Sequence, residues 1–160
     1  MNLGIGFDIH PLVTGRKLVL GGIELKFEKG LEGWSDADVL THAIIDALLG
    51  AAALGDIGKH FPPGAPEYKG ISSLDLLAEV KKKIFDNDWA IQNIDATVIA
   101  EKPHLRDVID TMRECLSKIL GIHVNQMSIK ASTANGVGNI GKGEAIAALA
   151  IASLSKNTKK

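Results

Sequence analysis

The clearest periodic pattern in the chain lies between residues 34 and 58. Apolar residues recur there at steps of three and four, as on one buried face of an α-helix: Leu40, Ala43, Ile44, Ala47, Leu48 and Ala51. Ser35, with Asp38 three residues later, predicts a capping box at the start of this helix. Gly50 and Gly55 indicate where the helix ends.

This helix also carries polar residues that a buried face does not need. Asp38, His42 and Asp46 are spaced by four, so we expect them on one side of the helix. A histidine flanked by carboxylates is a common arrangement around a metal ion. Taken alone, however, the pattern fits a solvated polar face better.

Residues 2–10 alternate in a way that predicts a strand with two different faces. One face is apolar and carries Leu3, Ile5, Phe7 and Ile9. The other face carries Gly4, Gly6, Asp8 and His10, so Asp8 and His10 point the same way and could share one cation. A hydrogen-bonded strand end explains this stretch equally well.

The remaining pattern predicts one α/β domain (an α+β sandwich) over residues 1–160. We expect strands at 17–20 and 23–27, joined by Gly21 and Gly22, and at 89–100 and 127–132, with helices at 72–85 and from Pro103 to a stop at Gly121; the segment 145–155 fits helix or strand. This order predicts a mixed four- to five-stranded sheet with helices on one face. Since nothing else in the chain can cover the other face, we expect an oligomer.

Two glycine-containing segments could bind a ligand. In residues 55–64, Asp56 and Lys59 lie among glycines, in either a binding loop or a plain connector. The glycine-rich segment 133–144 could bring backbone amides close to phosphate. It matches neither the P-loop nor the dinucleotide-binding spacing.

Composition narrows the class of protein. The net charge is −1 and aromatic residues make up 4%, which gives no reason to expect nucleic acid binding. The single cysteine, Cys115, excludes a disulfide framework within the chain and favours a reducing compartment. The pattern shows no signal peptide, and the longest apolar stretch, 145–154, is too short to span a bilayer. We therefore expect a soluble cytoplasmic protein with no membrane contact.

Asp8, His10 and His42 together form a set of three candidate metal ligands. Carboxylate and imidazole ligands of this number suit Zn²⁺ with an open fourth position, although Mn²⁺ or Co²⁺ would also be compatible. The helix start near Ser35 and the glycine-rich segment favour anions. A metal beside anion-binding backbone indicates phosphoryl chemistry, without naming a substrate.

Several motifs, in order along nearly the whole chain, resemble the signatures of the 2-C-methyl-D-erythritol 2,4-cyclodiphosphate synthase family. They lie at residues 6–10, 35–39 with 41–43, 46–52, 55–58 with 61–62, 100–103, 130–133 and 141–144. The resemblance implies a phosphorus–oxygen lyase of non-mevalonate isoprenoid biosynthesis. In its substrate, 4-diphosphocytidyl-2-C-methyl-D-erythritol 2-phosphate, the 2-phosphate attacks the β-phosphate, which gives the cyclic diphosphate and CMP.

The resemblance also implies an assembly and a set of site residues. It implies a homotrimer with active sites between subunits, a strand at the chain end, and a central channel that could hold an isoprenoid diphosphate. Asp8, His10 and His42 would hold Zn²⁺, and Thr133 and Trp34 take the catalytic positions. The substrate-binding positions would be Ser35 for phosphate, Asp56, Ile57, Gly58 and Phe61 around the methylerythritol, Ala100, Pro103, Leu105 and Ala131 in the cytidine pocket, and Ser132, Asn135 and Lys142.

Three residues depart from the family pattern. Trp34 stands where the family usually has histidine, and offers one N–H donor and no charge. Asn135 stands where a glutamate usually ligates a second Mg²⁺ or Mn²⁺ on the diphosphate, and Pro63 replaces a frequent acidic residue. We expect an active synthase that is slower or less dependent on the second metal.

Two other functions fit parts of the pattern. A metal-dependent phosphohydrolase would use Asp38 or Asp46 as a general base for water. A non-enzymatic binder of isoprenoid diphosphate would use zinc only structurally. Three ligands argue against the binder, because structural zinc sites normally have four.

Overall fold

Two long strands, β1 (Asn2–Thr14) and β7 (Ala145–Lys156), run side by side through the main sheet of the computed structural model, which describes residues 1–157. Five strands form this sheet in the order β4-β1-β7-β5-β6. β5 (Trp89–Ile99) pairs with β6 (Met127–Ser132) in parallel, and the other pairs are antiparallel, so the sheet is mixed. The predicted α/β class is confirmed.

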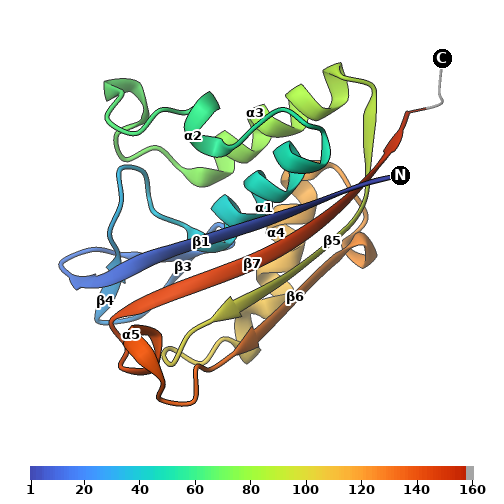
Figure 1. Ribbon diagram of the computed structural model, residues 1–160. Helices are drawn as coiled ribbons and strands as arrows, with labels where there is room; N and C mark the ends of the chain where they lie inside the picture. Colours follow the sequence, from blue (N-terminus) through green and yellow to red (C-terminus); the bar gives the residue numbers. More distant parts are fainter. Residues whose placement is uncertain (158–160) are drawn as a thin grey trace.

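The three longest helices cover one face of this sheet (Figure 1). The helices are α1 (Val39–Ala51), α2 (Ile57–His60), α3 (Ser73–Asp86), α4 (Ile109–Leu120) and α5 (Gly138–Gly141), and the short strands are β2 (Leu18–Leu20), β3 (Ile23–Leu25) and β4 (Lys29–Leu31). β2 and β3 form the predicted hairpin around Gly21 and Gly22. The final segment, which fitted helix or strand, is a strand. None of the helices within residues 1–157 is long and apolar enough to cross a membrane.

The predicted capping box at Ser35 is wrong, because α1 begins four residues later with Asp38 as its N-cap. The Asp38 carboxylate accepts the backbone N–H of Thr41 at 3.1 Å. It also accepts the N–H groups of Gly21 and Gly22, at 2.9 and 2.7 Å. A contact with the distant hairpin therefore decides where the helix starts.

The predicted start of α4 at Pro103 is wrong. The helix starts at Ile109, after a 3₁₀ turn at Arg106–Val108. Ala100 and Leu105 are buried in the core and keep the intervening segment against the body of the protein. The predicted end is confirmed, since Gly121 closes α4 in the left-handed conformation, with a φ of 70°. The glycine-rich loop contains one helical turn, α5.

Glycines on β1 bring α1 very close to the sheet. A Cβ atom on Gly6 would lie 1.9 Å from the Ala43 carbonyl oxygen, and one on Gly4 would lie 2.1 Å from that of Ala47. α1 is consequently buried on almost every side. This close packing places the first turns of α1 directly over the polar face of β1.

Across β1 and β7, the opposite face of the sheet is apolar and uncovered in the single chain. Its large side chains are between 39 and 70% exposed: Leu3, Ile5, Phe7, Ile9, Leu149 and Ile151. They form adjacent pairs across β1 and β7, such as Ile5 with Ile151 and Phe7 with Leu149. A continuous exposed apolar patch of this kind normally marks an interaction surface.

Candidate metal centre and substrate cleft

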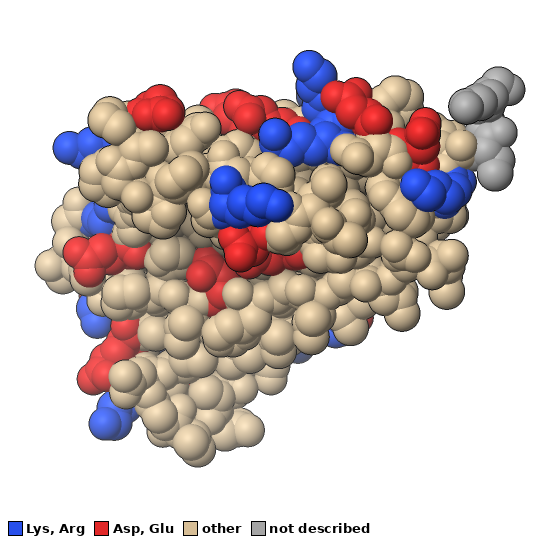
Figure 2. All heavy atoms as spheres, turned by 45° about the horizontal axis from the view of Figure 1, so that its top comes forward, with Lys and Arg blue, Asp and Glu red and all other residues tan. Residues whose placement is uncertain are grey.

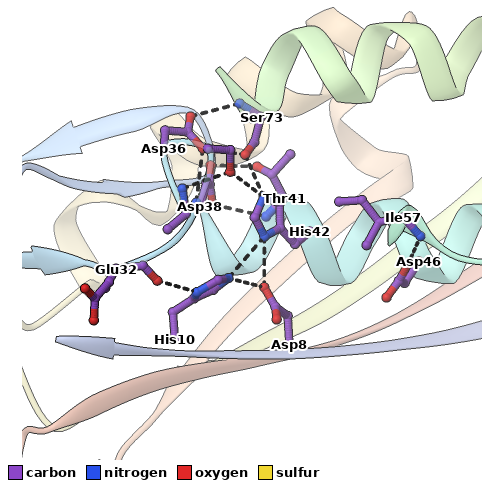
Figure 3. Close-up of polar contacts among 12 residues, drawn as sticks. Asp8, His10, Glu32, Asp36, Asp38, Thr41, His42, Asp46, Ile57 and Ser73 are labelled. Carbon is purple, nitrogen blue, oxygen red and sulfur yellow. Dashed lines mark hydrogen bonds and ion pairs between the residues drawn. The ribbon is translucent and has the colours of Figure 1, made fainter. Parts of the chain in front are cut away.

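Asp8 and His10 rise from the inner face of β1 and meet His42 from the first turn of α1 (Figure 3). Asp8 Oδ2 lies 2.9 Å from His10 Nε2 and 2.9 Å from His42 Nδ1. The two ring nitrogens are 3.3 Å apart. The structure thus brings together the three residues that the sequence indicated.

Hydrogen bonds on the far side of each ring fix which nitrogen faces inward. His10 Nδ1 lies 2.6 Å from the Glu32 carbonyl oxygen, which can only accept, so this nitrogen carries the proton. His42 Nε2 lies 2.9 Å from Ser73 Oγ, and the Ser73 hydroxyl in turn donates to the Asp36 carboxylate. Both histidines therefore keep a proton on the far nitrogen and turn the other nitrogen towards Asp8, where it can donate to the carboxylate or, once deprotonated, bind a metal ion.

These atoms fit a single metal ion. Asp8, His10 and His42 each offer one ligand atom, all within 4.8 Å of one another. Ligands bound to one tetrahedral zinc at about 2.0 to 2.2 Å lie roughly 3.3 to 3.6 Å apart, so the separations of 2.9 to 3.3 Å need to widen only by a few tenths of an ångström. One carboxylate and two supported imidazoles are also the donor types that zinc prefers in open, catalytic sites.

The charges of the three side chains reinforce one another. Burial alone would raise the pKa of Asp8, but hydrogen bonds from His10 and His42 hold it well below its usual range. Burial alone would lower the pKa of His10, but the hydrogen bond to Asp8 outweighs burial and raises the pKa of His10. Asp8 therefore stays ionised and supplies a negative charge at the point where the ligand atoms meet.

Asp38 and Asp46 do not join this centre, although they share its helix. Asp38 is fully buried and accepts hydrogen bonds from Gly21, Gly22 and Thr41, on the side away from β1. Asp46 accepts the N–H of Ile57 at 2.7 Å and so holds the start of α2. Neither carboxylate contacts His42, since each has a separate structural partner, and the alternative of a solvated polar face is also wrong, because Asp38 and His42 are buried.

A cavity of about 260 Å³ opens beside the metal centre. Five of the predicted substrate or catalytic residues line it together with the triad: Trp34, Ser35, Ile57, Gly58 and Phe61. Pro63 also lines it, whereas Asp56 caps α2 by accepting the Lys59 N–H at 2.8 Å and does not. Acidic side chains gather around a hollow on the face that carries α2 and α3, with a basic side chain beside them (Figure 2).

A second cavity, of about 690 Å³, lies at the ends of β5 and β6. It gathers the predicted cytidine-pocket residues with their neighbours: Ala100, Pro103, Leu105, Ala131, Ser132 and Thr133. Asn135 and Lys142 lie outside both cavities, and Asn135 Oδ1 accepts the Thr133 hydroxyl at 3.3 Å. Within residues 1–157 the two cavities share no lining residue.

The sequence pattern missed several residues of the site. Asp36 and Ser73 support His42 from behind, and Arg16 donates to the carbonyls of Gly33 and Ser35, at 3.0 and 2.8 Å. Other cavity residues that went unrecognised are Tyr68, Ile71 and Leu76 in the first, and His104, Arg106, Asp107 and Ile109 in the second. Asp36 could have been recognised from the sequence, because it directly follows Ser35 in a Ser-Asp pair of the motif. Ser73 could not, because a serine at that position is typical of an ordinary helix start.

An aspartate and two histidines converging beside a cleft on a mixed α/β scaffold are typical of an enzyme with a metal-binding site. The sequence model of the YgbB family matches residues 1–155, and the chain belongs to this family. It is 55% identical to the 2-C-methyl-D-erythritol 2,4-cyclodiphosphate synthase of Dehalococcoides mccartyi, over 95% of this chain and 97% of that protein. The resemblance found in the sequence motifs is confirmed.

Solved structures show the same fold. The bifunctional IspDF of Campylobacter jejuni superimposes with a TM-score of 0.93 at 35% identity, covering 97% of this chain and 42% of that one. The Plasmodium falciparum IspF, solved as a CDP complex, gives a TM-score of 0.87 at 29% identity, covering 98% of this chain and 97% of that one. Both agree with the arrangement of sheet and helices described above.

Proposed function

We propose that this chain is a 2-C-methyl-D-erythritol 2,4-cyclodiphosphate synthase. It converts 4-diphosphocytidyl-2-C-methyl-D-erythritol 2-phosphate to the 2,4-cyclodiphosphate and CMP, as a phosphorus–oxygen lyase of isoprenoid precursor biosynthesis. The observation that carries this proposal is the convergence of Asp8, His10 and His42 beside a cavity lined by the expected substrate-binding residues. A CDP complex of one structural neighbour supports a cytidine diphosphate substrate.

The metal cavity would hold the phosphate and sugar end of the substrate. A Zn²⁺ ion bound by the triad supplies charge neutralisation and polarisation of a phosphate oxygen. Ser35, whose hydroxyl lies 3.2 Å from His42 Nε2, contacts phosphate, and Ile57, Gly58 and Phe61 enclose the methylerythritol. Asp56, at the start of α2, stays a proposed contact of the sugar.

The second cavity would hold the cytidine and the leaving group. Ala100, Pro103, Leu105, Ala131 and Ser132 form the nucleoside wall. The exposed Thr133 hydroxyl hydrogen-bonds the diphosphate and stabilises the charge that develops on CMP. With Asn135 in place of a carboxylate, the chain offers only a neutral and weaker ligand, so a second Mg²⁺ or Mn²⁺ would be held mostly by the phosphates or would not bind.

The structure does not favour water as the attacking group. All the hydrogen bonds of Asp38 are to backbone and Thr41 groups, and burial raises the pKa of this carboxyl. Asp46 holds α2 and does not line the metal cavity. Neither acid is placed to activate a water molecule, so the substrate's own 2-phosphate is the proposed nucleophile.

A homotrimer would complete the site. Because the metal cavity and the nucleoside cavity are separate in one chain, a substrate that spans both needs a neighbouring copy. The exposed apolar face of β1 and β7 supplies the surface for such packing. The same proposal includes an isoprenoid diphosphate in the central channel and a cytoplasmic location, in keeping with the unpaired Cys115.

The function is tested by phosphorus NMR of the purified protein with the cytidyl substrate and Mg²⁺ or Mn²⁺, with and without chelator. The expected result is a chelator-sensitive cyclic diphosphate that forms with equimolar CMP. CMP with a linear product would indicate hydrolysis instead. No turnover by zinc-loaded protein would contradict the proposal and favour the binding function.

A further inference from the structure

Trp34 is exposed at the edge of the metal cavity, where an aromatic side chain needs an explanation. It is 41% exposed and lines the cavity with residues of the segment 61–71, which we call the strap. The strap runs from the end of α2 to the start of α3 and contributes Phe61, Pro63, Tyr68 and Ile71 to the cavity wall.

Two hydrogen bonds tie the strap to Trp34. The indole N–H donates to the Ala65 carbonyl at 2.9 Å, and the Gly70 N–H donates to the Trp34 carbonyl at 2.8 Å. The Lys69 ammonium lies 5.9 Å from the centre of the indole ring, within the range of a cation–π contact. One residue thus holds the strap on both sides of its 3₁₀ turn, Pro66–Tyr68.

The other backbone bonds of the strap are mostly local. Ala65, Tyr68 and Lys69 each donate three residues back along the chain, to Pro62, Ala65 and Pro66. These turns shape the strap but do not fix where it lies. Beyond Trp34, the ends of the strap are held by Phe61, which is buried in the core, and by Ile71, whose carbonyl accepts the Asp36 N–H at 3.0 Å; Tyr68 also packs against the core.

The bond to Ala65 also limits what Trp34 can do for the substrate. An indole has one donor and no acceptor, and this donor is already used. A direct hydrogen bond to phosphate would require breaking the bond to the strap.

We propose that Trp34 is a positioning residue, which fastens the strap across the metal cavity and so sets the width of the site for the substrate's sugar end. The proposal rests on the synthase function proposed above. A fastened strap favours the bound substrate and the transition state equally, so its loss raises KM and leaves kcat nearly unchanged.

The test is Trp34→Phe, which keeps an aromatic ring and removes the N–H donor. Losing one neutral hydrogen bond of about 1 kcal/mol loosens the strap roughly five-fold. We expect amide hydrogen exchange at Gly70 to quicken by about that factor, and KM for the cytidyl substrate to rise similarly. The amide of Leu12, which donates to Glu144 at 2.8 Å in β1, is the internal reference and should not change.

Trp89→Phe is the matched control. It makes the same chemical change beside Lys156, away from both substrate cavities, and should alter neither Gly70 exchange nor KM. Unchanged exchange at Gly70 in Trp34→Phe would overturn the fastening role, whatever the enzyme's activity. Faster exchange with an unchanged KM, or a fall in kcat alone, would overturn the role in shaping the site. Failure of the synthase assay in the unaltered protein would instead contradict the proposed function, and the exchange result would stand by itself.

Discussion

Ser73 lies between His42 and Asp36 and has no exposed surface. Its hydroxyl accepts from His42 Nε2 and donates to Asp36, so it keeps the other nitrogen of His42 free for a metal. Ser73→Ala removes this acceptor and leaves only Ser35 Oγ, at 3.2 Å. We expect zinc affinity, measured by competition with a chelator, to fall by about ten-fold or more.

Ser117→Ala provides the comparison for Ser73→Ala. Ser117 is also buried, and within residues 1–157 its hydroxyl has no hydrogen-bond partner. This substitution should leave zinc affinity unchanged. Equal zinc affinities for the two variants and the unaltered protein would show that Ser73 does not support His42.

Asp46 gives a pH dependence with a definite sign. Burial, together with the nearby Asp56 and Asp8 carboxylates, raises its pKa above the ordinary value of 3.8, against the hydrogen bond from Ile57. The contribution of a raised carboxyl pKa to stability is complete below 3.8 and is lost as the pH rises through the folded-state value. At neutral pH the ionised side chain therefore lowers the free energy of unfolding.

Asp46→Asn keeps an oxygen that can accept the Ile57 N–H and removes the charge. In metal-free protein at neutral pH, we expect urea unfolding to show a gain of a few tenths of a kcal/mol, small because the side chain is partly exposed. The gain should vanish below pH 3.8. A difference that grows in acid would contradict this account.

At the scale of elements, the sequence pattern predicted those strands, turns and helices that depend mainly on neighbouring residues. The alternation in β1, the glycine turn between β2 and β3, and the helix α3 were all predicted from neighbouring residues. The start of α1 was not, because the Asp38 carboxylate is held by two N–H groups of the β2–β3 turn. The β7 pattern was ambiguous, because a strand buried along one face with small residues on it resembles a helix.

The same distinction applies to the candidate site. The metal triad could be predicted because strand alternation and helix spacing place Asp8, His10 and His42 on known faces. The bond between Ser73 and Asp36 could not, since 37 residues separate the two and neither is an unusual residue type. The separation of the metal and nucleoside cavities also depends on tertiary structure.

The packing of α1 on β1 makes Gly6 a sensitive position. Gly6→Ala would place Cβ 1.9 Å from the Ala43 carbonyl oxygen, so α1 would have to move. We expect the free energy of unfolding to fall by about 3 kcal/mol or more. Zinc binding should weaken with it, because His42 moves with the helix. Denaturant unfolding and chelator competition measure the two effects.

Gly50→Ala tests whether any added methyl group would act in the same way. Gly50 is in the last turn of α1, and the nearest atom to its added Cβ would be 3.9 Å away. Alanine there should raise stability by up to about 1 kcal/mol through helix propensity. A loss at Gly50 comparable to that at Gly6 would argue against the close-approach explanation.

At the scale of the whole molecule, the apolar face of β1 and β7 determines the proposed trimer. Ile5 is 70% exposed in the single chain, so Ile5→Asp should spare the fold of the subunit. Sedimentation should show trimers for the unaltered protein and monomers for Ile5→Asp, because a buried unpaired carboxylate is costly. Phe85→Asp, which changes a residue 65% exposed on α3, should remain trimeric. Trimers of Ile5→Asp would exclude this face as the interface.

The two faces of β1 have a consequence for how the sequence can vary in length. Successive side chains on a strand alternate between the faces, so inserting one residue between Asp8 and His10 would put these two side chains on opposite faces and turn part of the apolar row inward. Metal binding and assembly would be lost together, through a change that adds no unfavourable residue type. An insertion of the same size at Gly64, a strap residue with open space around its Cα, would leave the frame of β1 intact. The chain can therefore be lengthened at its loops, whereas β1 tolerates no change in the number of residues between its functional side chains.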